Sequence, residues 1–313
     1  MAGSMKNYLS QLLSMYWLRP ETALWRTFDC LLMEKYGNIS GKSIDLGCGD
    51  GTMSYLMAGG IIKKFDAYME VGQLHNYNAG ADIHNQNPVI TPEADDKKLR
   101  YQFEWGVDHK EGLINKARRF AGFYKNTAVC DLNEKLQFED EHFDSAFSNI
   151  LYWLDGIDTT LSEWHRVIKK DGKLYLFVPT ASFKEKAWLY YLAPHVGERK
   201  YLNYFDRGYN ALIHHCYGTS RWEGIFNKNG FSIVDHHLYL TAPVMDVFNI
   251  GTRPIAPLLI NMSNMLTPDG REAAKSEWVD YFSNFFTPII EGEFGRTVAE
   301  DDAAFHFFVL EKK

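Results

Sequence analysis

The sequence predicts an α/β protein built on a doubly wound, mostly parallel β-sheet. Short apolar segments with strand character alternate with helical segments from residue 101 to residue 178, and this alternation is typical of parallel sheets covered on both faces. A glycine-rich loop joins a short strand to a helix near residue 47. The composition, 46% hydrophobic and 23% charged over 313 residues, is that of a globular protein with a sizeable core.

The individual elements follow from periodicity and from their boundary residues. Helical periodicity spans residues 6–36 and is interrupted at Pro20, which suits the first turn of a second helix. Gly59 and Gly60 are expected to end the helix that follows the glycine loop. We expect strands at 43–46, 101–107, 127–130, 143–149, 173–178, 231–240 and 304–310, and helices at 52–58, 110–120, 160–168, 182–192 and 220–228.

Two regions depart from the alternation. Residues 65–100 are rich in Asn, Asp, Gly and Pro and form a long excursion, whereas residues 243–300 are helix-forming with four prolines as punctuation. The resulting domain prediction has an N-terminal helical segment, a core with an insertion, a helical cap insertion and a final core strand. Its boundaries are 1–42 (with 1–4 resembling a cloning remnant), 43–242 with the insertion at about 67–100, 243–300 and 301–313.

Charge and cysteine usage narrow the class of protein. A net charge of −7 argues against nucleic acid as the main partner, because phosphate binding needs clustered Lys and Arg. The four cysteines have no CxxC spacing, so reduced thiols are expected. The chain opens without signal-peptide character and has no run of 18 apolar residues. A cytoplasmic protein without a transmembrane segment is the expectation.

The glycine loop carries the strongest chemical signal. The segment Asp45-Leu46-Gly47-Cys48-Gly49-Asp50-Gly51 leaves a strand and enters a helix. Glycines there permit backbone conformations and close approaches that a Cβ would block. A dinucleotide fingerprint needs a glycine at the sixth position, where this sequence has Thr52. The acidic Asp45 suits a ligand with an ammonium group better than one with a pyrophosphate.

At this point the sequence resembles the class I S-adenosylmethionine-dependent methyltransferase family, of the kind called methyltransferase type 11. The resemblance runs from about Leu24 to Phe231 and rests on motifs in the family's order. These are Ile44 to Ser54, Trp105 to His109 followed by Leu113 to Ala117, Cys130-Asp131-Leu132 followed by Leu136 to Phe138, Phe143 to Leu154, and Trp164 to Gly172. The resemblance implies a Rossmann-like, seven-stranded sheet whose last strands form an antiparallel pair.

The resemblance also implies a cofactor, S-adenosyl-L-methionine, with S-adenosyl-L-homocysteine as the product. Gly47, Gly49 and Gly51 would pack against its methionine part, and Asp45 would orient the ammonium directly or through water. Asp108 would accept both ribose hydroxyls. Asp131 would accept from the adenine amino group, while the Leu132 N–H donates to the ring. The full implied cofactor set is Asp45, Gly47, Cys48, Gly49, Gly51, Asp108, His109, Asp131, Leu132 and Asn149.

The position of Asp108 departs from the simple pattern. It lies 63 residues after Asp45, whereas a simple strand–helix–strand unit places this carboxylate roughly 20 residues on. Asp66 fits that simple count. We prefer Asp108, because Lys63-Lys64-Phe65-Asp66 lacks the preceding apolar strand and the following helix. The residues between them then form an insertion that shapes the substrate entrance or is disordered.

Aromatic residues make up 15% of the chain and suggest an apolar acceptor chamber, although core packing explains many of them. Tyr152 and Trp153 follow the fourth strand, where this family lines its transfer site. Histidine is the usual base near neutral pH, so His215, next to His214, is the candidate base. His236 and His237 lie on one strand, and no metal site is expected. The candidates are Tyr152 and His215 for catalysis and Tyr16, Trp17, Trp153 and Tyr209 for the substrate.

The predicted reaction is in-line methyl transfer to a small acceptor, hydrophobic or lipid-linked. The apolar segment Val244 to Leu266 would cover the acceptor, contact a membrane surface peripherally or form a dimer, and these alternatives stay open, as does a monomer. Two rival functions also stay open. One is a dinucleotide-dependent oxidoreductase, against which Thr52 argues, and the other is a catalytically silent cofactor-binding partner protein.

Overall fold

The structure is a computed structural model that describes residues 2–63, 66, 93–95, 99–120, 122–187, 195, 215–250 and 255–313. Its centre is a seven-stranded sheet with the order β5-β4-β1-β6-β7-β9-β8. β9 is antiparallel to both β7 and β8, and the other pairs are parallel. The strands are β1 (Ser43–Leu46), β4 (Phe103–Asp108), β5 (Tyr124–Val129), β6 (Phe143–Ser148), β7 (Ile168–Pro179), β8 (Phe231–Thr241) and β9 (Ala303–Lys312).

These are the seven strands that the sequence predicts, with shifted boundaries. β5 begins at Tyr124 rather than at 127, and β7 begins at Ile168 rather than at 173. Pairing with β4 and β6 extends the two strands backwards through residues whose own pattern is polar. The mostly parallel α/β prediction, including the antiparallel C-terminal strand, is confirmed.

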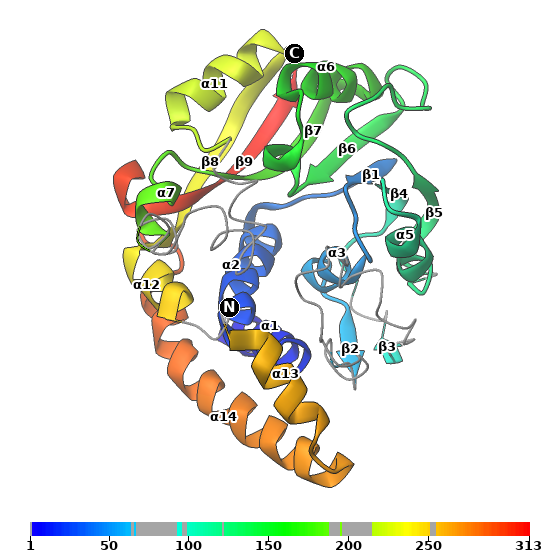
Figure 1. The fold of residues 1–313 in the computed structure, drawn as a ribbon. Helices are drawn as coiled ribbons and strands as arrows, with labels where there is room; N and C mark the ends of the chain where they lie inside the picture. Colours follow the sequence, from blue (N-terminus) through cyan, green and yellow to red (C-terminus); the bar gives the residue numbers. More distant parts are fainter. Residues whose placement is uncertain are drawn as a thin grey trace.

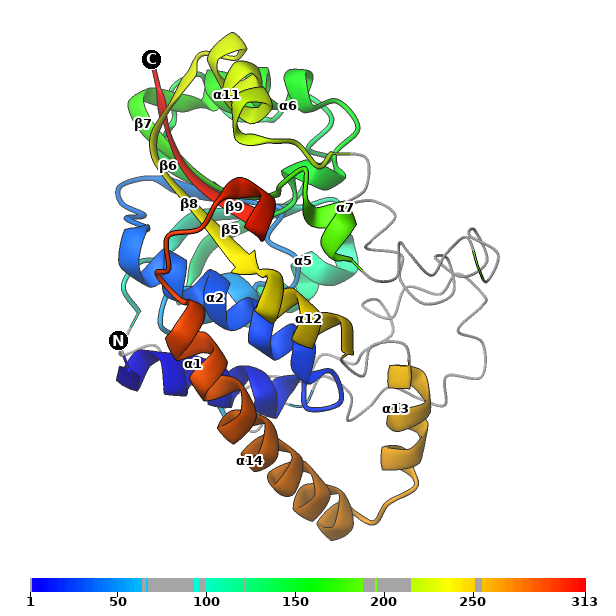
Figure 2. The same ribbon diagram turned by 90° about the vertical axis from the view of Figure 1, so that its left-hand side faces the viewer.

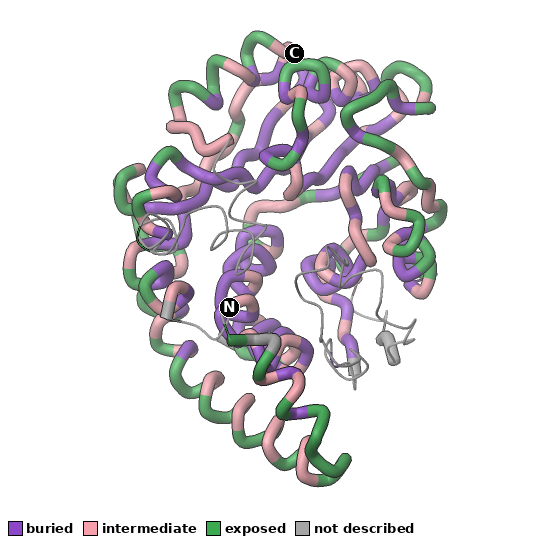
Figure 3. The backbone as a smooth tube through the Cα atoms, in the orientation of Figure 1, coloured by how far each residue is buried: buried purple, intermediate pink, exposed green. Residues whose placement is uncertain are grey.

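Helices cover both faces of this sheet (Figure 1). On one face lie α2 (Pro20–Tyr36) and α3 (Thr52–Met57), and on the other lie α6 (Ile157–Val167) and α11 (Thr219–Lys228). The short helix α5 (Glu111–Ala117) packs against β4 and β5. Figure 3 shows the resulting buried layer along the strands and α2.

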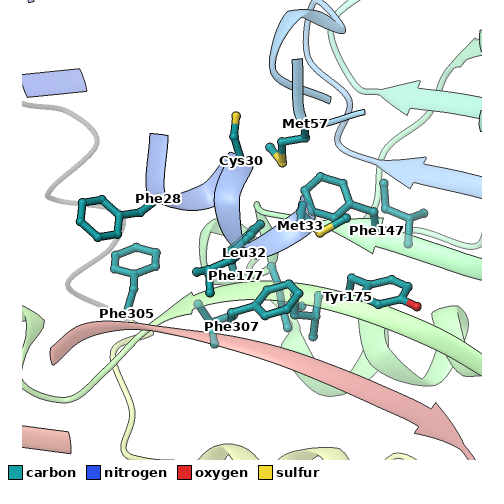
Figure 4. Packing of buried hydrophobic residues seen from close by; sticks show 14 of the residues in the cluster. Phe28, Cys30, Leu32, Met33, Met57, Phe147, Tyr175, Phe177, Phe305 and Phe307 are labelled. Atoms are coloured by element: carbon teal, nitrogen blue, oxygen red, sulfur yellow. The ribbon is translucent and has the colours of Figure 1, made fainter. Parts of the chain in front are cut away.

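The largest part of the core lies between α2 and the sheet. Figure 4 shows Phe28, Leu32 and Met33 of α2 facing a row of aromatic rings from β6, β7 and β9. All of these side chains are buried, and the rings include Phe177 and Phe307, whose centroids are 4.8 Å apart. The N-terminal helical segment is therefore part of the packing of the sheet.

The helical segment between β8 and β9 consists of α12 (Ala242–Ile250), α13 (Ala256–Asn264) and α14 (Pro268–Glu293). α14 packs against α1 (Ala2–Met15) and α2. Figure 2 shows the tight turn by which the chain passes from α13 into α14. Pro288 was expected to interrupt this segment but lies inside α14. The helix continues because Phe286 and Ile290, on either side of it, are buried in the core.

The expected excursion after α3 lies mostly outside the described residues. Its ends form a small antiparallel pair, β2 (Ile61–Lys63) with β3 (Glu93–Asp95). The predicted helix at 182–192 is described as α7 (Phe183–Lys186) up to residue 187. Within the described residues, every helix is too short or too polar to cross a bilayer.

Candidate active site

The order in which strands are added to the sheet reverses between β1 and β6. From β1 the chain adds β4 and β5 on one side, and it then adds β6 and β7 on the other side. Ligands of open α/β sheets bind at the carboxyl ends of the strands at such a switch point. The glycine loop after β1 lies at this edge. Its Gly47 and Cys48 N–H groups both donate to the Val107 carbonyl of β4, each at 2.9 Å.

Two of the loop glycines have different steric roles. Gly47 has φ +87°, and a Cβ there would lie 2.3 Å from Cγ1 of Ile150, which follows β6. Gly49 has φ +57°, and a Cβ there would meet no atom within 4 Å. Gly47 is therefore required by the protein's own packing, whereas Gly49 borders open space where a ligand can approach the backbone.

Asp108 lies at the end of β4, directly beside Gly49. One carboxylate oxygen accepts from the Gly49 N–H at 3.1 Å and the other from the Lys110 N–H at 2.9 Å. The His109 ring nitrogen Nδ1 is 3.4 Å from the second oxygen, with the His109 side chain largely exposed. A carboxylate has about four acceptor positions, so Asp108 keeps capacity for two further donors. This fits a ribose diol.

Asp45 is more enclosed than the sequence indicates. Its carboxylate accepts a hydrogen bond of 2.6 Å from the Tyr124 hydroxyl of β5, and the residue is only 1% exposed. Burial raises the pKa of Asp45 to about 7, against the opposing effect of hydrogen bonds from Ser54 and Tyr124. Of the two roles expected for Asp45, the indirect one agrees better with this burial.

The turn after β5 presents Asp131 at the surface. Its carboxylate accepts from the Asn133 N–H at 2.9 Å and from the Asn133 side chain at 3.0 Å, so it forms an Asx turn. The next residue, Leu132, is buried. The Cys130 N–H donates to the Asp108 carbonyl at 2.9 Å. The structure thus brings Asp45, Asp108 and Asp131 to one edge of the sheet.

Beyond β6, the half-buried Asn149 leads into a 3-10 turn, Leu151–Trp153, which carries the two predicted aromatic residues. Tyr152 is buried, and its ring is 5.2 Å from that of Trp153 and 5.9 Å from that of Phe305. Burial raises the pKa of Tyr152 to about 12, so it remains a phenol at neutral pH. Trp153 is 47% exposed and faces outward.

The predicted N-terminal aromatic residues differ in burial. Tyr16 is half-buried, and burial together with the charge of Asp50 raises its pKa. Trp17 is 2% exposed and donates from Nε1 to Asp66 at 2.9 Å. Trp17 packs with Leu18 and with Ile260 of α13, and Tyr16 packs against the same cluster. Tyr209 lies outside the described residues.

His215 lies near the carboxyl end of β7. Its Nδ1 is 3.3 Å from the Tyr217 hydroxyl, and the Tyr217 N–H is 3.4 Å from the Pro179 carbonyl at the end of β7. The adjacent His214 lies outside the described residues. A base at His215 would therefore act from the β7 side of the site, opposite the cofactor carboxylates.

Three further histidines, His236, His237 and His306, belong to the packing of β8 and β9. His236 Nε2 is 2.9 Å from His306 Nδ1, and His306 Nε2 donates to the Tyr217 carbonyl at 3.1 Å. Burial lowers the pKa of His306 to about 3, so it is neutral. His237 stacks on Tyr36 at 3.6 Å. Within the described part of the chain, no three potential metal ligands among His, Cys, Asp and Glu come together.

A polar network on α2 is absent from the sequence prediction. Arg26 Nη1 donates to Asp29 at 2.7 Å, and the Tyr239 hydroxyl of β8 donates to the other Asp29 oxygen at 2.8 Å. Asp29 is fully buried. The i, i+3 spacing of Arg26 and Asp29 on an otherwise apolar helix is the one signal that could have indicated it. Its approach to Tyr152 depends on tertiary structure alone.

Comparison with known proteins finds a match to one family model. Residues 93–176, from β3 into β7, match the family model described as a methyltransferase domain. No curated protein matches the sequence. Residues 93–176 thus match a methyltransferase domain, and the sheet has the seven-stranded order, with an antiparallel last strand, that the sequence resemblance implies.

Three similar solved structures are each distant from this chain in sequence. The [4+2]-cyclase SpnF is 14% identical, with 94% of this chain and 82% of that chain covered and a TM-score of 0.48. Phosphoethanolamine N-methyltransferase 2 of Haemonchus contortus, in complex with phosphomonomethylethanolamine and S-adenosylhomocysteine, is 16% identical (92% and 53% covered, TM-score 0.47). Geranyl diphosphate methyltransferase, in complex with its cofactor, is 10% identical (94% and 90% covered, TM-score 0.46).

Proposed function

We propose that the enzyme transfers the methyl group of S-adenosylmethionine to a small, largely apolar acceptor at the carboxyl edge of β6 and β7. The observation that carries the proposal is the pairing of Asp108 with Gly49. A carboxylate with spare acceptor capacity is held by the N–H of a glycine whose Cβ position is open. This arrangement suits a nucleoside with a free ribose diol.

The proposed cofactor contacts follow the carboxyl ends of three neighbouring strands. Asp108 holds the ribose, with His109 beside it, and the turn containing Asp131 and Leu132 contacts the adenine. Gly47, Cys48, Gly49 and Gly51 line the methionine part, and Asn149 closes the edge next to β6. Asp45 acts beneath the loop, and Tyr124 fixes its orientation with a 2.6 Å hydrogen bond.

The acceptor lies on the other side of the switch point, where β6 and β7 end. Bound S-adenosylmethionine supplies an electrophilic methyl group, so the protein needs mainly to position the acceptor and exclude water. Tyr152 contributes a neutral hydroxyl at this position, and Trp153 and Tyr16 contribute apolar surface. Trp17 supports the fold from behind, bound to Asp66, rather than lining the acceptor site.

His215 is the proposed general base for an acceptor that must lose a proton. Its side chain is half-buried at the end of β7, beside the Tyr217 hydroxyl. If His215 is the base, methyl-transfer activity rises with pH as the imidazole loses its proton, and His215→Gln abolishes that dependence. An unchanged pH profile in the variant would assign proton removal to another group or to water.

Calorimetry with S-adenosylhomocysteine tests the cofactor proposal directly, with NADH as the competing ligand. We expect S-adenosylhomocysteine to bind and NADH to give no heat. Binding of NADH instead would favour an oxidoreductase. Binding of S-adenosylhomocysteine without methyl transfer to any apolar alcohol, amine or acid in an acceptor panel would favour a silent partner protein.

A further inference from the structure

Arg26 lies beside the proposed acceptor position and has hydrogen-bonding capacity to spare. It is carried by α2, and its guanidinium Cζ is 5.7 Å from the ring centroid of Trp25. The Trp25 ring packs on Phe305 at 4.8 Å, and Phe305 packs on Tyr152 at 5.9 Å. Phe305 pairs with Pro179, the last residue of β7. These contacts place Arg26 at the carboxyl edge of β6 and β7.

The hydrogen bonding of Arg26 differs from that of a purely structural arginine. Arg166 uses Nε, Nη1 and Nη2, which donate to Glu163, Asp140 and two backbone carbonyls. Within the described residues, Arg26 donates from Nη1 to a single oxygen of Asp29, and its side chain also makes a hydrogen bond with Tyr152. A guanidinium has five N–H donors. Most donors of Arg26 are thus left for another partner, and its side chain is 25% exposed.

Among the described residues, the acceptors next to Arg26 are the Asp29 carboxylate and the Tyr152 hydroxyl oxygen. The Trp25 indole Nε1 is buried and has no hydrogen-bond partner among the described residues. The Tyr152 side chain is a neutral phenol, because burial raises its pKa. The Tyr239 hydroxyl already donates a hydrogen bond to Asp29. Asp29 is the carboxylate in contact with Arg26, and it accepts from both Arg26 and Tyr239. A ligand that offers oxygen acceptors complements this arrangement.

Charge points in the same direction. The proposed cofactor carries a positive sulfonium, whereas the charge of Arg26 is balanced by Asp29, so these three groups together keep one net positive charge. In a poorly solvated site, an anionic group on the acceptor offsets this excess, and guanidinium pairs well with planar or tetrahedral oxyanions. We infer that the acceptor carries an oxyanion, a carboxylate or a phosphate, and that Arg26 binds it. This inference rests on the proposed function and identifies the substrate class.

The test uses the full-length enzyme loaded with S-adenosylhomocysteine and three matched probes: octanoate, octyl phosphate and octan-1-ol. Isothermal calorimetry measures the affinity of each probe. We expect one or both anions to bind at least about tenfold more tightly than the alcohol, as charge-assisted hydrogen bonds require. The stronger of the two anions identifies the source of the oxyanion. Equal affinities for all three probes, or no binding of either anion, would overturn the inference.

Two isosteric or near-isosteric variants separate ligand binding from a structural role. Arg26→Gln is expected to lose about tenfold or more in anion affinity. Asp29→Asn retains an oxygen for the Tyr239 hydroxyl but removes the competing charge, so anion affinity should rise about threefold or more. A merely structural ion pair would make both variants weaker. Equal changes in the same direction therefore contradict the proposal.

Further controls guard against unfolding and against failure of the cofactor proposal. The double variant R26Q/D29N leaves no unpaired buried charge, and it should behave like Arg26→Gln if Arg26 binds the anion. Arg296→Gln removes an exposed cation from the segment that follows α14 and should leave probe affinity unchanged. S-adenosylhomocysteine should bind all variants equally. If the wild type does not bind S-adenosylhomocysteine, the proposed function is refuted. If it binds S-adenosylhomocysteine but binds the anionic probes no more tightly than octan-1-ol, only this inference is refuted.

Discussion

The Trp17 indole donates a 2.9 Å hydrogen bond to Asp66, and this contact ties the loop between α1 and α2 to the cap. Asp66 also accepts from Arg271 at 3.1 Å and lies 3.8 Å from Lys275, both on α14. Asp66 has the spacing from the glycine loop that a ribose-binding carboxylate would have in a simple strand–helix–strand unit. Its carboxylate is instead committed to holding α14 in place.

Asp66→Asn should therefore reduce stability without reducing cofactor affinity. The amide keeps an acceptor for Trp17 but leaves Arg271 and Lys275 without a counterion in a site where all three side chains are at most 13% exposed. We expect a loss of about 1–3 kcal/mol in the free energy of unfolding. Chemical denaturation measures this loss. Asp158→Asn, which breaks an exposed pair with Lys228, is the matched control and should have almost no effect.

Asp108→Ala should show the opposite behaviour. The substitution removes two charge-assisted hydrogen bonds to the ribose, each contributing roughly 1.5–3 kcal/mol. The affinity for S-adenosylhomocysteine should fall at least about tenfold, measured by calorimetry, with Asp66→Asn run in parallel. If Asp66→Asn weakened cofactor binding and Asp108→Ala did not, the assignment of the two carboxylates would be reversed.

The glycine loop allows steric and ligand-binding effects to be separated. Gly47→Ala places a methyl group 2.3 Å from Ile150 at φ +87°, so we expect a large loss of stability, of the order of several kcal/mol. Gly49→Ala meets no atom within 4 Å and costs only the left-handed conformation, about 1–2 kcal/mol. We expect Gly49→Ala to fold, yet to bind S-adenosylhomocysteine poorly. Normal cofactor affinity in this variant would show that the ligand does not approach Gly49.

Asp45 should make stability depend on pH. Its folded pKa of about 7 lies above the ordinary value of 3.8, mainly because the group is buried. The folded state therefore holds the proton more tightly than the unfolded chain, and this contribution to stability is complete below pH 3.8. It is lost as the pH rises through 7. Asp45→Asn stays neutral, so the wild type should lose stability relative to the variant between pH 4 and 7.

Between pH 4 and 7, the free energy of unfolding of the wild type should fall by roughly a few kcal/mol relative to that of Asp45→Asn. Thermal or chemical denaturation at several pH values, on both proteins, measures it. A constant difference between wild type and variant would show that Asp45 ionises at its ordinary pKa in the folded protein. The wild type should also release protons when a ligand ammonium binds near pH 6–7, which calorimetry in buffers of different ionisation enthalpy detects.

Local patterns were sufficient to predict all seven strands and the glycine loop, because apolar alternation and positive-φ glycines are properties of short segments. The choice of Asp108 over Asp66 also rested on local context, namely a strand before it and a helix after it. Boundaries were less predictable: β7 extends back to Ile168 only because β6 offers it a pairing partner. Pro288 lies within α14 because the flanking Phe286 and Ile290 are buried by distant parts of the chain.

Short-range pattern in this chain specifies the α/β core, the order of its strands along the sequence and the loop with its neighbouring acids. Contacts between distant segments specify the rest: Tyr124 against Asp45, Trp17 against Asp66, and Arg26 and Asp29 with Tyr239. The physical reason is that hydrogen bonds, burial and pKa values depend on which atoms are neighbours in space. A one-dimensional pattern carries the periodicity of an element but not the identity of what packs against it.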